Sequence, residues 1–198
     1  VVITRTLEYL VPESTEEAAE LLASSDDEAK LLAGGTWVVP DMTHGKTKPS
    51  RIVDLRRAGL SGITEEDGHV VVGATATYSE IAASDLLREK VGLLPLAASK
   101  ITGGAQVRNF ATAGGSACYA IPSSDAPSWL VALGAKMRLL GASGEREVAA
   151  EDFFRGAFRT AARPDEVLTG MAVPTPPVGA RFAYHTLKFG ESGWPIAT

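Results

Sequence analysis

The sequence has one cysteine, three histidines and no long apolar run, and each of these shortages excludes a class of protein. One cysteine in 198 residues cannot form an internal disulfide, as is typical of proteins from a reducing cytosol. It also leaves no set of thiolates for a zinc ribbon or an iron–sulfur cluster. The histidines lie outside any HExxH pattern, so no metal site is expected. Redox chemistry on this chain would therefore need an organic cofactor.

Charge and hydropathy exclude further classes. The net charge is −5, and no block of Lys and Arg offers the phosphate contacts on which nucleic-acid binding rests. No apolar run approaches the roughly 20 residues of a membrane span, and the N-terminus lacks a signal-peptide pattern. Apolar residues make up 45% of the chain, as in an ordinary globular protein. The composition predicts a soluble, cytoplasmic α/β or α+β protein.

Residues 1–57 are predicted to form a small N-terminal lobe. Alternating residues before Pro12 indicate a strand, and Ser14 with Glu17 three positions later is a capping box that begins a helix. A short apolar strand then runs into a glycine turn, and "RIVDLR", residues 51–56, is a further strand. The order strand–helix–strand–turn–strand is that of an α/β unit.

Residues 58–178 are predicted to form a second, larger lobe. Asp67-Gly68 lies at the turn of a hairpin that spans residues 63–73. Thr77 and Glu80 form a second capping box before one helix through "YSEIAASDLLRE". A second hairpin and a late strand follow. Residues 179–198, with a strand in "ARFAYHTLKF", are predicted to begin a third domain.

Two segments place a hydroxyl residue directly after a pair of glycines, Ala33-Gly34-Gly35-Thr36 and Ala113-Gly114-Gly115-Ser116. One such pair is most often an ordinary turn. Two of them favour a shared anionic ligand, because glycine lets a backbone N–H approach a phosphate and the hydroxyl adds a donor. No G-x-G-x-x-G occurs, and "HGKT" lacks the first glycine of a P-loop. We expect the two segments to hold one pyrophosphate from both sides.

The same segments carry a family resemblance. "KLLAGGTWVVPDM" and "GGAQVRNFATAGGSACYAIPSSDAPSWLVALGA", in this order, resemble the two FAD-binding segments of the flavoprotein (medium) subunit of molybdenum hydroxylases, the family of xanthine dehydrogenase and carbon monoxide dehydrogenase medium subunits. The resemblance covers essentially the whole chain. It implies a two-lobed α+β fold of the PCMH type, with a small α/β lobe, a larger lobe of mixed or antiparallel sheet, and FAD between them. It also implies that a C-terminal lobe is missing from this chain.

The resemblance assigns residues to the cofactor by motif. Those of the first pyrophosphate loop are Leu32, Ala33, Gly34, Gly35, Thr36 and Trp37, preceded by Lys30, for which an exposed surface charge is the alternative. Those of the second are Ala111, Thr112, Gly114, Gly115 and Ser116, followed by Cys118 and Tyr119.

Individual roles are expected for four residues, two of them with an alternative. Asp125 matches a carboxylate that accepts from ribityl or ribose hydroxyls, with the N-cap of a helix as the alternative. Lys188 matches a lysine near the flavin, with a surface charge as the alternative. Cys118 is expected to pack as a small apolar residue behind the loop. Tyr119 departs from the family pattern and is placed to shield or stack on the flavin.

The resemblance implies a non-covalent FAD subunit of a molybdenum hydroxylase-type oxidoreductase. Substrate would react on a molybdopterin-bearing large subunit, and electrons would arrive through a small subunit with [2Fe–2S] clusters. The flavin would pass them to NAD, a quinone or oxygen. No residue of this chain is assigned as a catalytic acid, base or metal ligand. Two alternatives remain: a stand-alone PCMH-type flavin oxidase and a non-enzymatic nucleotide-binding protein.

Overall fold

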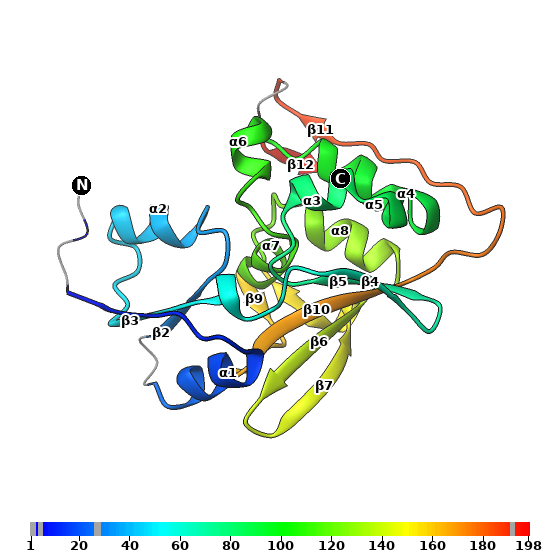
Figure 1. Cartoon of the computed structure of the whole chain (residues 1–198). Helices are drawn as coiled ribbons and strands as arrows, with labels where there is room; N and C mark the ends of the chain where they lie inside the picture. Colours follow the sequence, from blue (N-terminus) through cyan, green and yellow to red (C-terminus); the bar gives the residue numbers. More distant parts are fainter. Residues whose placement is uncertain (1–2, 4–5, 26–28, 191–192) are drawn as a thin grey trace.

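Two β-sheets of different kinds organise the chain in the computed structural model, which describes residues 3, 6–25, 29–190 and 193–198 (Figure 1). The first is parallel, with the order β1–β3–β2, and consists of β1 (Glu8–Leu10), β2 (Ala29–Leu32) and β3 (Arg51–Asp54). The second is antiparallel, with the order β4–β5–β10–β6–β7, and consists of β4 (Ile63–Glu66), β5 (His69–Gly73), β6 (Lys136–Gly141), β7 (Gly144–Ala149) and β10 (Val167–Pro174).

Helical elements connect and follow the strands of the first sheet. Helix α1 (Thr15–Ala23) connects β1 to β2, helix α2 (Val38–Thr43) connects β2 to β3, and the 3-10 turn η1 (Leu55–Arg57) follows β3. Ser14 caps α1 as predicted, accepting from the Glu17 N–H at 3.1 Å, but the Glu17 carboxylate accepts from the Glu13 N–H instead of returning to Ser14. The capping box is therefore only half formed. The strand predicted over residues 51–56 ends at Asp54, because the Asp54 carboxylate accepts from the Arg56 N–H and begins η1.

The second sheet confirms both predicted hairpins. Asp67 (φ 44°) and Gly68 (φ 77°) are both left-handed, which is the conformation of a primed two-residue turn between β4 and β5. β6 and β7 pair over their full length, from Lys136 opposite Ala149 to Gly141 opposite Gly144. β10 lies at the centre of the sheet, and its residues are buried along almost the whole strand.

Helices cover one side of the antiparallel sheet, above it in Figure 1. They are α3 (Tyr78–Ala83), α4 (Asp85–Lys90), α5 (Leu93–Ser99), α6 (Gly104–Arg108), α7 (Ala113–Tyr119) and α8 (Asp125–Ala132); α9 (Ala150–Phe153) follows β7. The Thr77–Glu80 capping box is complete. The single helix predicted after it is broken at Ser84, because the Ser84 hydroxyl accepts from the Leu87 N–H and begins α4 as a new helix. These helices and the sheet share the larger hydrophobic core.

A second, smaller core joins the two sheets. Ala18 and Leu22 of α1 pack with Val53 of β3, and the same cluster includes Leu140 of β6 and Val167 of β10. Helix α1 therefore packs against strands of both sheets. The division at residue 57 falls in sequence between the two sheets and stays a prediction.

The late strand predicted in "ARFAYHTLKF" is mostly wrong. Only Leu187–Lys188 forms a strand, β11, which pairs with β12 (Pro195–Ala197); residues 176–186 are irregular. Alternating residues favour a strand, but within the described chain no neighbouring strand pairs with residues 176–186. A further two-stranded pair, β8 (Phe154–Gly156) with β9 (Arg159–Thr160), lies beside α7.

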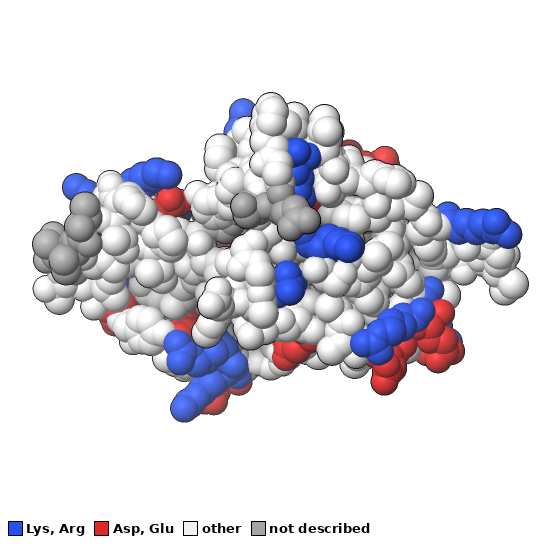
Figure 2. All heavy atoms as spheres, turned by 90° about the horizontal axis from the view of Figure 1, so that it is seen from above, with Lys and Arg blue, Asp and Glu red and all other residues white. Residues whose placement is uncertain are grey.

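Figure 2 shows the face seen from above, where Lys and Arg side chains are scattered between uncharged areas instead of gathering in one patch. Among the described residues, no helix combines the length and apolarity that a membrane crossing requires. In the same part of the chain, no group of three or more His, Cys, Asp or Glu side chains is placed to hold a metal ion.

Candidate functional site

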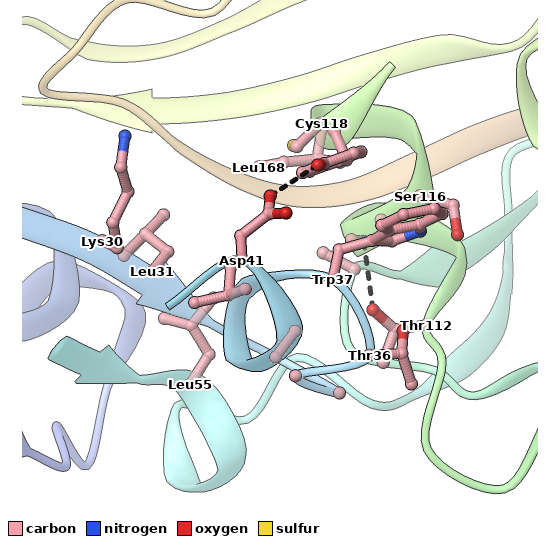
Figure 3. A pocket seen from close by; sticks show the side chains of 18 of the residues that line it. Lys30, Leu31, Thr36, Trp37, Asp41, Leu55, Thr112, Ser116, Cys118 and Leu168 are labelled. Atoms are coloured by element: carbon pink, nitrogen blue, oxygen red, sulfur yellow. Dashed lines mark hydrogen bonds between the residues drawn. The ribbon is translucent and has the colours of Figure 1, made fainter. Parts of the chain in front are cut away.

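The two glycine segments meet at a cavity of about 380 Å³ (Figure 3). One wall is β2 with the loop into α2, and the other is α7. Most of the predicted cofactor residues line it, namely Lys30, Ala33, Gly34, Gly35, Thr36, Trp37, Thr112, Gly114, Gly115, Ser116, Cys118 and Tyr119. Leu32, Ala111, Asp125 and Lys188 do not. Two segments far apart in the sequence thus form one site.

The loop between β2 and α2 presents unpaired donors. The backbone N–H groups of Gly34, Gly35, Thr36 and Trp37 donate to no described backbone carbonyl, and all four residues line the cavity. Gly35 has a φ of 71°, which turns the chain between β2 and α2. Successive N–H groups without internal partners are the kind of concavity that binds an anion.

The second glycine segment is built differently, because it is the first turn of helix α7. The Thr112 hydroxyl caps this helix by accepting from the Gly115 N–H at 3.0 Å. The N–H groups of Ala113 and Gly114 donate to the carbonyls of Ala76 and Ala74, at 3.1 and 3.2 Å. The prediction of a second set of free N–H donors is therefore wrong, since the protein already uses them. On this side the cavity is lined by small residues, the Ser116 hydroxyl, the Cys118 side chain and the Tyr119 ring.

Two glycines are required by contacts within the protein. A Cβ on Gly34 would lie 1.7 Å from the Phe110 carbonyl oxygen, and one on Gly114 would lie 2.4 Å from that of Ala74. Real Cβ atoms essentially never come closer than 3.0 Å to such a neighbour. Gly34 therefore allows the first segment to touch the backbone that leads into the second. The sequence predicts these glycines for the close approach of a phosphate, whereas packing within the protein already requires them.

Side chains join the two segments on the other side. The Tyr119 hydroxyl at the end of α7 donates to the Asp41 carboxylate of α2 at 2.6 Å. The Trp37 and Tyr119 rings stack with centroids 4.8 Å apart and an interplanar angle of 11°. Burial and the Asp41 carboxylate raise the pKa of Tyr119 to about 12, so its hydroxyl remains a donor at neutral pH. Two further rings pack on this pair. The centroid of Trp194 lies 5.2 Å from that of Trp37, and the centroid of Phe158 lies 5.5 Å from that of Tyr119.

Asp125 and Lys188 lie outside the cavity. Asp125 is buried as the first residue of α8, and its carboxylate accepts from the Thr198 hydroxyl at 2.8 Å. The helix begins after Ser124, so Asp125 is not its N-cap. The Lys188 ammonium donates to the Thr102 hydroxyl at 2.8 Å. Their predicted contacts with a cofactor stay predictions.

Cys118 lines the cavity with an exposed side chain, so the expectation that it packs behind the loop is wrong. Other residues line the cavity without being indicated by the sequence motifs, namely Leu31, Val38, Asp41, Thr47, Leu55, Ala74 and Leu168. A signal existed only for Asp41, which follows Trp37 by one helical turn and so shares its face of α2.

Comparisons with known proteins agree over most of the chain. Residues 5–176 match the family model described as the FAD binding domain in molybdopterin dehydrogenase. The carbon monoxide dehydrogenase medium chain of Afipia carboxidovorans is 38% identical over 187 residues, which are 94% of this chain and 65% of that protein. The xanthine dehydrogenase FAD-binding subunit of Escherichia coli O157:H7 is 34% identical over 163 residues, 81% of this chain and 55% of that subunit.

Solved structures show the same likeness. A chain of carbon monoxide dehydrogenase from Hydrogenophaga pseudoflava superposes with a TM-score of 0.94 at 35% identity, covering 98% of this chain and 68% of that one. A chain of quinoline 2-oxidoreductase from Pseudomonas putida 86 has a TM-score of 0.92 at 28% identity, covering 97% of this chain and 66% of that one. The present chain thus spans between 55% and 68% of the length of these relatives.

Proposed function

The chain belongs to the family of FAD-binding domains in molybdopterin dehydrogenases, and from this premise we propose that it holds FAD in the cavity between its two glycine segments, as the flavin-bearing part of an oxidoreductase of the molybdenum hydroxylase type. The observation that carries the proposal is the row of unpaired N–H groups from Gly34 to Trp37 at the cavity wall. A pyrophosphate is the part of FAD that such donors suit.

The proposed contacts are unequal on the two walls. The first segment would donate backbone hydrogen bonds to pyrophosphate oxygens, and the Thr36 hydroxyl would add another. The second would contribute the Ser116 hydroxyl and the small residues of α7, whose N–H groups are already paired. Lys30 supplies a positive charge at the cavity. The donor set fits an anionic dinucleotide without a cluster of basic residues.

FAD supplies the electron-accepting ring, and the residues of this chain bind it, orient it and limit the access of water. The Trp37–Tyr119 stack and the apolar side chains of Leu55 and Leu168 give the cavity a largely apolar lining. A reduced dielectric strengthens the hydrogen bonds that hold a cofactor. No side chain of the cavity is assigned a proton-transfer role.

We further propose that the chain works as part of a complex. Relatives carry names such as "medium chain" and "6-hydroxypseudooxynicotine dehydrogenase complex subunit alpha", which are those of parts of larger assemblies. The chain would take electrons from [2Fe–2S] clusters of a small subunit, downstream of a molybdopterin-bearing large subunit, and pass them to NAD, a quinone or oxygen. The single cysteine of this sequence cannot ligate such a cluster. The cytoplasmic location stays a prediction.

Titration of the purified chain with FAD tests the proposal. We expect uptake of one FAD per chain, visible as absorbance near about 450 nm and released by acid. Thr36→Val should weaken binding by roughly fivefold to tenfold, because it removes one hydroxyl donor and keeps the shape. Thr43→Val is the matched control, since the Thr43 hydroxyl donates to Val39 within α2 and lies outside the cavity. A chain that takes up no FAD contradicts the proposal.

A further inference from the structure

Two contacts between the walls of the cavity differ in character. At one place, Gly34 packs directly on the Phe110 carbonyl, so that even a methyl group would not fit between them. At the other, the Tyr119 hydroxyl bonds to Asp41 (the dashed bond from Asp41 in Figure 3), and its ring stacks on Trp37. All five residues except Phe110 line the cavity.

Only the second contact can open without moving backbone. Gly34 and Phe110 meet through main-chain atoms, and separating them would move β2 or the chain before α7. Tyr119 and Asp41 meet through side chains, which can part by rotation about their χ angles. The Tyr119 hydroxyl remains protonated and the acceptor is a carboxylate, so the bond is of the strong, charge-assisted kind.

A cavity of about 380 Å³ is at the lower end of the range of about 300–1,000 Å³ for drug-sized ligands. A dinucleotide cofactor is larger than most such ligands, and of the two contacts only that of Tyr119 with Asp41 can part without moving backbone. We propose that Tyr119 is a latch residue: with Asp41 and Trp37 it holds the two segments together, and FAD exchanges only while the Tyr119–Asp41 bond is broken. This inference rests on the proposed binding of FAD in this cavity.

A latch makes a kinetic prediction that a simple contact does not. If FAD passes only while the latch is open, its association and dissociation rate constants are both multiplied by the fraction of time that the latch is open. Both rate constants are therefore small when the closed arrangement dominates. Tyr119→Phe removes the hydroxyl and keeps the ring on Trp37. We expect the association and dissociation rate constants of FAD both to rise roughly 10- to 100-fold, the factor that corresponds to one hydrogen bond to a charged group. The equilibrium constant should change much less.

Stopped-flow flavin fluorescence on the whole chain measures both rate constants. Tyr9→Phe is the matched control, because the Tyr9 hydroxyl also donates to a carboxylate, that of Asp54, outside the cavity. Asp41→Ala should reproduce the effect of Tyr119→Phe, and the double variant should add nothing to either. Asp41 also pairs with Lys46 at 3.5 Å, but Lys46 is largely exposed and contributes little.

The outcomes separate the two proposals. Wild type that binds FAD, together with a Tyr119→Phe variant whose rates equal those of Tyr9→Phe, overturns the latch alone. A rise in the dissociation rate without a rise in the association rate also overturns it, because this is the result for a direct contact with bound flavin. Wild type that binds no FAD overturns the proposed function and the latch with it.

Discussion

Gly34→Ala is the substitution that tests most directly why the glycines are present. The new Cβ would lie 1.7 Å from the Phe110 carbonyl oxygen, whereas real contacts stay beyond 3.0 Å, so the two segments must separate by about 1.3 Å. Main-chain atoms cannot move aside as a flexible side chain can. We therefore expect the free energy of unfolding to fall by about 3–5 kcal/mol, which is more than the usual loss of about 1–3 kcal/mol on overpacking. If the free energy of unfolding falls by about 2 kcal/mol for each 1 M urea, the urea concentration at the unfolding midpoint should be about 2 M lower than in wild type.

The assay is urea unfolding of the chain without added FAD, with Gly62→Ala as control. Gly62 has no atom within 4 Å of its would-be Cβ, so its substitution should stay within about 0.5 kcal/mol of wild type. If Gly34 served only to admit a phosphate, Gly34→Ala would lose FAD binding and keep its unfolding midpoint. A midpoint equal to that of Gly62→Ala refutes the steric argument.

Two further substitutions test the cap and an ion pair. Thr112→Val removes the N-cap of α7 and should cost about 0.5–2 kcal/mol, seen as a melting temperature several degrees lower, whereas Thr112→Ser should retain most of the stability. The Arg146 guanidinium, at 2.6 and 2.7 Å, holds the pKa of nearly buried Glu166 below its ordinary 4.5. The stabilisation that this ion pair gives the folded protein is complete above the unfolded pKa of 4.5. It is lost as pH falls through the lower pKa that Glu166 has in the folded protein. Urea midpoints from pH 6 to 3 should therefore fall less steeply in Glu166→Gln than in wild type; equal slopes contradict this assignment.

Local signals in the sequence predicted the elements whose causes are local. Asp67-Gly68 requires a left-handed turn wherever it joins two strands, and Thr77 with Glu80 caps a helix through atoms three residues apart. The family motifs also brought both glycine segments to one cavity, as the structure confirms. In each case the sequence window contains all the interacting groups.

The remaining features depend on partners far away in the chain. The helical state of Gly114 and Gly115 opposes their intrinsic propensity and is supported by the Thr112 cap and by the Ala74 and Ala76 carbonyls. The Tyr119–Asp41 bond spans 78 positions, and no short pattern indicates it. Alternation in residues 180–189 has the period of a strand but does not say whether a neighbouring strand exists.

The small core around helix α1 has a consequence for how the molecule unfolds. Ala18 and Leu22 are buried by strands on both sides of the division at residue 57, among them β3 and β10. Neither sheet can expose its part of this cluster without exposing that of the other. The two sheets should therefore melt as one cooperative unit, and a chain cut after residue 57 would yield two pieces that each lack half of a shared interior.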